Sequence, residues 1–156
     1  MDLVLLFILI VINGLLAMSE IAVVSSRKSR LQKLADDGSL GARSALELSN
    51  EPSGFLSTIQ VGITTVGILS GAIGESALAD PLTLWLSKFA LFEPYARALA
   101  FTAVVVGLTY FSVVVGELVP KRLGLLAPEP IAAMIAAPMN ILARLARPLV
   151  WLLSSS

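Results

Sequence analysis

Residues 98–122 read ALAFTAVVVGLTYFSVVVGELVPKR, an apolar run with a single acidic residue, Glu117, close to its end. A helix needs roughly 20 mostly apolar residues to cross a bilayer, so this run predicts a membrane span. A charged side chain at the centre of a span costs about 2.5–3.5 kcal/mol on insertion scales. The position of Glu117 therefore predicts a cation site, a proton path or an ion pair.

Two further apolar segments resemble this one. The segment 3–24 contains Asn13, Ser19 and Glu20, and the segment 52–74 contains no charged residue. The chain is 56% hydrophobic and 14% charged, whereas about 25% of the residues in a soluble domain are charged. The sequence therefore predicts an all-α membrane protein, with spans at about residues 3–26, 54–76 and 98–120.

The basic residues predict the orientation of these spans. Apart from Lys88 and Arg97, every lysine and arginine falls on one side of the predicted bilayer. By the positive-inside rule that side is cytoplasmic. We expect a multi-pass protein of the plasma membrane (the cell inner membrane) with its N-terminus outside and its C-terminus in the cytoplasm.

Two segments outside the spans predict amphipathic juxtamembrane helices. The first, at about 28–49, is divided by the turn sequence Asp36-Asp37-Gly38-Ser39. The second, at about 128–153, carries Pro138 within an uncharged run that is too short to span a bilayer. We expect it to form a helical hairpin on the cytoplasmic face.

The composition excludes several classes of function. The chain has no cysteine and no histidine, which removes the usual ligands of zinc, copper and haem. Its net charge of zero gives no reason to expect nucleic acid as a partner. The spans contain neither aspartate nor histidine, so an intramembrane protease is not expected, nor any other enzyme. A metal ion would have to be bound by oxygen, which indicates a hard cation.

The motif around Glu117 offers two oxygen ligands together. Pro120 has no amide hydrogen and clashes with the carbonyl four residues earlier, which belongs to Gly116. That carbonyl loses its helical partner beside a carboxylate, and broken helices in membranes coordinate cations with such carbonyls. The alternative is an ion pair between Glu117 and Lys121, which are four residues apart.

The first two spans offer further oxygen atoms. In the first span Glu20 shares a face with Asn13, and its alternative is an ion pair with Arg27. In the second span Gly67 and Gly71 lie on a face of small residues, which allows close packing within one subunit or between two. The candidate metal ligands are Ser19 or Glu20, Ser70 or Thr64, and Gly116 with Glu117; Asn13, Ser25 and Thr64 are secondary candidates. Two carboxylates with neutral oxygens suit a divalent cation, and the residues alone leave magnesium, calcium and manganese open.

These motifs together resemble the membrane domain of the CorC/cyclin-M family of magnesium transporters, over nearly the whole chain. The matching features are Asn13-Gly14 and Ser19-Glu20, the sequence TIQVG at 58–62, Gly116-Glu117 with Pro120-Lys121, and the basic stretch SRKSRLQKL at 26–34. Many relatives have a small polar residue two positions before Ser19, where this chain has Ala17. For that reason both Ser19 and Glu20 stay candidates for the ligand of the first span.

The resemblance implies a homodimer in the lipid bilayer that exports Mg²⁺, coupled to inward Na⁺. It places the magnesium site at Ser19 or Glu20, at Ser70, and at Gly116 with Glu117. It also implies cytoplasmic CBS domains after the membrane part, which residues 1–156 do not include. The alternative function is a magnesium sensor or regulatory scaffold that binds Mg²⁺ through the same residues without transporting it.

Overall fold

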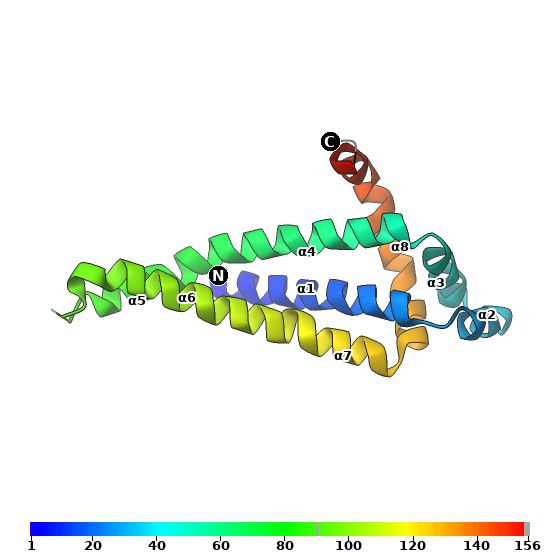
Figure 1. Cartoon of the computed structure of the whole chain (residues 1–156), viewed down its shortest axis with the longest axis horizontal. Coiled ribbons are helices and arrows are strands. Elements are labelled where there is room, and N and C mark those ends of the chain that lie inside the picture. The colour runs from blue at the N-terminus through cyan, green and yellow to red at the C-terminus, as the bar shows by residue number, and fades with distance from the viewer. Residues whose placement is uncertain (90, 155–156) are drawn as a thin grey trace.

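The computed structural model describes the backbone of residues 1–89 and 91–154, and the side chains of 1–89 and 91–142. Every regular element in this part of the chain is a helix (Figure 1). Three helical segments are long and apolar enough to cross a bilayer. The prediction of an all-α membrane protein with three spans is confirmed.

The three spans differ in their continuity. The first is one α-helix, α1 (Asp2–Ser25). Each of the other two contains a π-helical turn, in which the hydrogen bonds join residues five apart. The second consists of α4 (Pro52–Gly74), the π turn η1 (Glu75–Ala79) and α5 (Asp80–Leu86). The third consists of η2 (Glu93–Tyr95), α6 (Ala96–Val113), the π turn η3 (Val114–Leu118) and α7 (Val119–Leu126).

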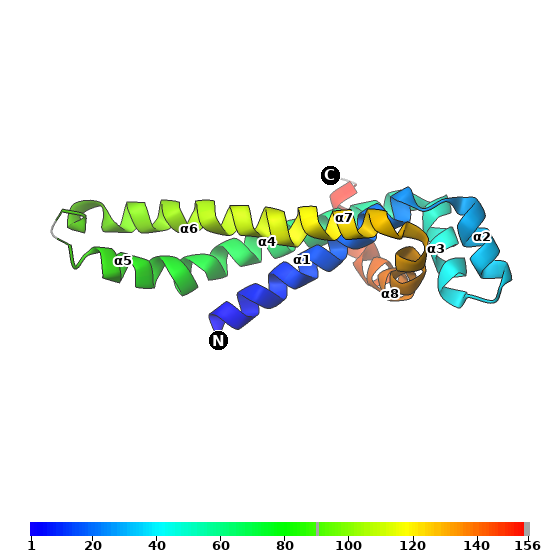
Figure 2. The same cartoon turned by 90° about the horizontal axis from the view of Figure 1, so that it is seen from below.

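The second span continues as a helix beyond its expected end, because η1 leads directly into α5. The helix tolerates Pro81 in its first turn after η1, where the amide of Asp80 donates to the carbonyl of Glu75. Helices α5 and α6 extend side by side past the N-terminus of α1 (Figures 1 and 2). Near their tip Phe89 makes edge-to-face contacts with Trp85 and Phe92.

Two short helices and the helix α8 (Pro128–Ser154) cover the opposite end of the bundle, which we call the α8 end. Helices α2 (Lys28–Asp36) and α3 (Leu40–Asn50) are separated by a turn in which Gly38 has a φ of +99°. Such a backbone conformation favours glycine. The side chain of Ser39 caps α3 by accepting a hydrogen bond from the amide of Ala42 at 3.2 Å. The expected turn between two amphipathic helices is therefore present.

The expected hairpin after residue 128 is wrong: α8 (Pro128–Ser154) is one continuous helix. A proline inside a helix removes one hydrogen bond and strains the turn before it, but a single proline does not by itself end a helix that is held by packing. Helix α8 crosses the long helices near α3 (Figure 1) and packs on α1, α3 and α4.

The apolar core lies at the α8 end. Its members come from α1, α2, α3, α4 and α8, and the largest are Leu16, Val23, Leu31, Leu48, Phe55, Ile59 and Ile135. The third span contributes few buried residues: Ala96 and Ala100 in α6, Gly116 in η3 and Gly124 in α7. In Figure 2 α1 diverges from α6 towards its N-terminus. The spans are therefore packed together at the α8 end, and α1 separates from α6 towards the N-terminus.

Candidate cation site

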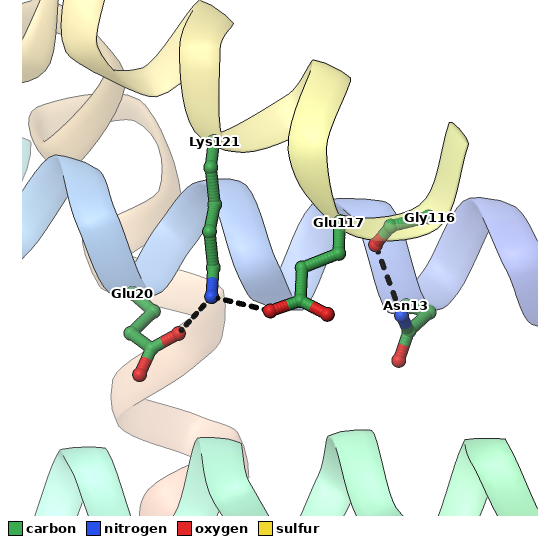
Figure 3. Close-up of polar contacts among 5 residues, drawn as sticks. All are labelled: Asn13, Glu20, Gly116, Glu117 and Lys121. Carbon is green, nitrogen blue, oxygen red and sulfur yellow. Dashed lines mark hydrogen bonds and ion pairs between the residues drawn. The ribbon is translucent and has the colours of Figure 1, made fainter. Parts of the chain in front are cut away.

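The π turn η3 brings a backbone carbonyl to the first span. The amide of Val119 donates to the carbonyl of Val114, five residues earlier, and Pro120 follows directly. Pro120 cannot donate to Gly116, so that carbonyl lacks its ordinary helical donor. Instead, Nδ2 of Asn13 donates to it at 2.9 Å (Figure 3). The free carbonyl expected from the sequence is thus the atom through which the first and third spans make a polar contact.

Two glycines allow α1 and the third span to approach this closely. A Cβ atom on Gly116 would lie 3.2 Å from Nδ2 of Asn13 and 3.5 Å from the carbonyl oxygen of Ile10. A Cβ atom on Gly14 would lie 2.9 Å from Cγ of Pro120. A side chain at Gly14 would force Pro120 to shift, and one at Gly116 would crowd the amide of Asn13, so the close approach of the two helices depends on small residues here.

A cavity of about 210 Å³ lies beside this contact, between the three spans. Its polar lining residues are Asn13 from α1, Ser70 from α4, and Thr109 and Ser112 from α6. Ser70 is only 5% exposed. Within the part of the chain that the structure describes, Oδ1 of Asn13 is buried and has no hydrogen-bond partner. A buried acceptor without a donor is costly, and a cation or a water molecule would satisfy it.

The two glutamates lie beside this contact and share one lysine. Nζ of Lys121 is 2.8 Å from Oε1 of Glu117 and 3.4 Å from Oε2 of Glu20. In Figure 3 the carboxylate of Glu117 lies between the ammonium group and Asn13. The expected ion pair of Glu117 with Lys121 is therefore present. Glu20 also pairs with Lys121. The ion pair of Glu20 with Arg27, which was the alternative prediction for Glu20, is not formed.

The remaining candidates lie elsewhere. Ser19 is fully buried, and its hydroxyl donates to the carbonyl of Leu15 at 2.6 Å, within its own helix. Thr64 is exposed on α4 and does not line the cavity. Ser25 lines a different cavity, with Arg27 and Glu129, at the α8 end. Of the candidates, Asn13 and Ser70 line the cavity, and Asn13 also contacts Gly116. Glu117 and Glu20 do not line it and share Lys121.

Sequence reasoning missed Thr109 and Ser112. Ser112 precedes Gly116 by four residues and Thr109 by seven, so all three share one face of the third span. That periodicity was a usable signal. Glu129 was also missed: its carboxylate accepts a hydrogen bond from the amide of Arg27 at 3.3 Å and lies 3.9 Å from Nη1 of Arg30.

The face of small residues on α4 is open within one chain. A Cβ atom on Gly67 or on Gly71 would meet no atom within 4 Å, whereas one on Gly74 would meet Leu108. Of the two expected uses of this face, close packing inside one subunit therefore holds for Gly74 and not for Gly67 or Gly71. Both of these glycines line the cavity.

The donor atoms of this cluster favour a hard cation. Among the described residues no three carboxylate, imidazole or thiolate side chains are grouped as a metal site. The cluster instead combines one carboxylate with amide, hydroxyl and backbone carbonyl oxygens. Oxygen ligands of this kind suit Mg²⁺ and Ca²⁺.

Comparison with known proteins gives the family context. The family model of the cyclin M transmembrane N-terminal domain matches residues 4–156. A UPF0053 protein of Synechocystis is 47% identical over 156 residues, which is 100% of this chain and 35% of that protein. The polyamine export protein of Salmonella typhimurium is 34% identical over 146 residues, 94% of this chain and 32% of that protein. A UPF0053 protein of Bacillus subtilis is 31% identical over 155 residues, 99% of this chain and 34% of that protein. The chain spans about one third of the length of these relatives.

Proposed function

This chain belongs to the cyclin M transmembrane N-terminal domain family, and we propose that it is the ion-translocating part of a magnesium exporter. The observation that carries the proposal is the cavity lined by Asn13 and Ser70. Beside it, Asn13 donates a hydrogen bond to the carbonyl of Gly116, the neighbour of Glu117. Three different spans line the cavity. An ion bound there would therefore respond to any movement of one span against another, as transport requires.

The ligands of the ion follow from the contacts at the cavity. Oδ1 of Asn13 is a buried acceptor without a hydrogen-bond donor in the described part of the chain, and Ser70 of α4 lines the same cavity. Glu117 supplies the negative charge, and the Gly116 carbonyl has a second lone pair beside the one that Asn13 uses. Mg²⁺ loses its water reluctantly, so we expect it to keep several water molecules in this cavity.

The direction of transport and the orientation are parts of the same proposal. The α8 end carries the basic helices α2 and α7, so it faces the cytoplasm under the positive-inside rule. Mg²⁺ would then enter from the α8 end and leave at the opposite end, where α5 lies, driven by Na⁺ moving inward. The CBS domains expected in the rest of the protein would lie beyond Ser156, on the cytoplasmic side.

A homodimer is supported by the exposed face of α4. Its residues follow helical spacing, are small or polar, and are exposed in one chain: Ser57, Gln60, Thr64, Gly67 and Gly71. Hydroxyls and glycines of this kind favour contact with another helix over contact with lipid. A second copy of the chain placed on this face would shield it and would close one side of the cavity.

Polyamine export is a second candidate, because two observations favour it. Relatives 31–34% identical to this chain are named polyamine export proteins. The structure also holds one primary ammonium group, that of Lys121, between Glu20 and Glu117. A polyamine presents the same chemical group, so the two carboxylates would also suit it.

The first test is ligand-dependent thermal stability of the purified full-length protein, wild type beside Glu117→Gln. A ligand that binds only the folded state stabilises it by RT ln(1 + [L]/Kd). We expect the melting temperature to rise with Mg²⁺ concentration in the wild type and to stay constant in the variant. A rise with spermidine and none with Mg²⁺ would replace magnesium by polyamine as the substrate. No rise with either would remove the site.

Flux into liposomes separates transport from sensing. A transporter reconstituted alone moves Mg²⁺ at a rate that depends on Glu117 and on a Na⁺ gradient. A sensor or scaffold binds Mg²⁺ with the same residues and moves none. Stabilisation by Mg²⁺ without flux would therefore favour the sensor.

A further inference from the structure

Lys121 makes a contact that the proposed ion must disturb. Its ammonium group touches both acidic side chains of the region, at 2.8 Å from Glu117 and 3.4 Å from Glu20. An exposed helical pair four residues apart would involve Glu117 alone. Here the second carboxylate comes from α1, so Lys121 joins the first span to the third (Figure 3).

This ion pair lies partly out of water. The side chains of Lys121, Glu20 and Glu117 are 31%, 27% and 40% exposed. Screening by solvent is therefore incomplete even before the lipid around the spans is considered. The ammonium compensates one of the two negative charges when no ion is bound, which lowers the cost of keeping two carboxylates at this depth.

A divalent cation at Glu117 would compete with the ammonium of Lys121 for the negative charge of one carboxylate. Both need the same carboxylate, and two positive charges held by one carboxylate repel each other strongly where the dielectric constant is low. Lysine carries its charge on a flexible stem of four carbons, so it can leave the carboxylate without any movement of the backbone. On the premise of the proposed cation site, we propose that Lys121 is a tethered competitor of the transported ion.

The competition has a structural consequence. If Lys121 leaves both carboxylates, its contact with Glu20 of α1 is lost as well. Binding of the ion would then remove one polar contact between α7 and α1, while the close packing of Gly124 against Met18 and Ile21 would remain. The polar contact between Asn13 and Gly116 would remain. The ion pair therefore couples occupancy of the site to a polar contact between these two spans.

Chemical labelling of amines in the full-length protein in lipid nanodiscs tests this directly. The other lysines of the chain, Lys28, Lys33 and Lys88, are exposed and serve as internal references. We expect saturating Mg²⁺ to raise the labelling rate of Lys121 about tenfold relative to them. Choline chloride at equal ionic strength is the control for screening of the ion pair by salt.

The outcomes separate this inference from the proposed function. Thermal stabilisation by Mg²⁺ with an unchanged labelling rate of Lys121 would overturn the competition and keep the cation site. Absence of any stabilisation by Mg²⁺ would overturn the site itself. A higher labelling rate that choline chloride reproduces would also overturn the competition, because ionic strength alone would then open the pair.

Substitutions give a second measurement. Lys121→Met keeps the length of the stem and removes the charge, so the Mg²⁺ concentration for half-maximal stabilisation should fall about tenfold. Lys121→Arg keeps the charge and adds donors that suit a carboxylate, so this concentration should rise. Arg122→Met, at the exposed neighbouring position, is the matched control and should leave it unchanged. Equal Mg²⁺ midpoints in all three variants would show that Lys121 joins α1 to the third span and does not compete with the ion.

Discussion

The two π turns of this protein have the same local design and different surroundings. Each ends two residues before a proline, η1 before Pro81 and η3 before Pro120. Each also carries a glutamate, Glu75 in η1 and Glu117 in η3. In both, the wider turn accommodates a proline that cannot donate to the carbonyl four residues earlier.

What differs is the helix that packs against each turn. Helix α1 packs on η3, and Asn13 donates to the carbonyl of Gly116. The turn η1 packs on α6 instead, and its side-chain hydrogen bonds are local: Ser76 donates to Ile73 at 3.1 Å and Thr83 to Ala79 at 2.7 Å. The two turns therefore share a proline and a glutamate, and they differ in the hydrogen bond that η3 receives from Asn13 of another span.

Replacing the proline after η3 should weaken Mg²⁺ binding, and replacing the proline after η1 should not. In Pro120→Ala the amide of residue 120 becomes free to donate to Gly116, so the carbonyl returns to the helix. We expect the apparent affinity for Mg²⁺ to fall about tenfold, which corresponds to ~1.4 kcal/mol. Pro81→Ala is the matched control at η1 and should leave the affinity unchanged. Both are measured by thermal stability against Mg²⁺ concentration. Equal losses in the two variants would mean that a general change in the spans, not the Gly116 carbonyl, sets the affinity.

Removing the hydrogen bond that Asn13 of α1 donates to Gly116 should lower the stability of the protein even when no ion is bound. Asn13→Ala leaves the carbonyl of Gly116 buried without its donor, and we expect a loss of about 1 kcal/mol, since a typical hydrogen bond contributes about that much. The melting temperature without Mg²⁺ should fall by about 2–4 °C. Ser76→Ala removes an exposed local bond at η1 and should change stability by less than about 0.5 kcal/mol. An Asn13 variant as stable as the wild type would mean that the contact contributes nothing to joining the spans.

The comparison also explains which features could be predicted from the sequence. The three spans follow from length and composition, and the free carbonyl of Gly116 follows from covalent chemistry, because a proline has no amide hydrogen wherever it lies. The donor from Asn13 and the second partner of Lys121 depend on how α1 packs against the third span, which one sequence does not specify. The prediction of a hairpin at Pro138 was wrong for a related reason. A proline strains a helix, but the surrounding contacts decide whether the helix ends there.

The glutamate of η1, Glu75, is a position at which we expect substitution to have no effect on Mg²⁺ binding. Glu75 is exposed and lines a cavity of about 80 Å³ with Gly71 and Thr109, and both of these also line the cavity beside Asn13. This proximity makes Glu75 the most demanding control for Glu117. Glu75→Gln should leave the Mg²⁺ midpoint of thermal stabilisation unchanged, because no oxygen atom from α1 lines the cavity beside it. If Glu75→Gln instead raised the midpoint as much as Glu117→Gln, a carboxylate in a π turn would be sufficient for the ion. The packing of α1 on η3 would then serve stability alone.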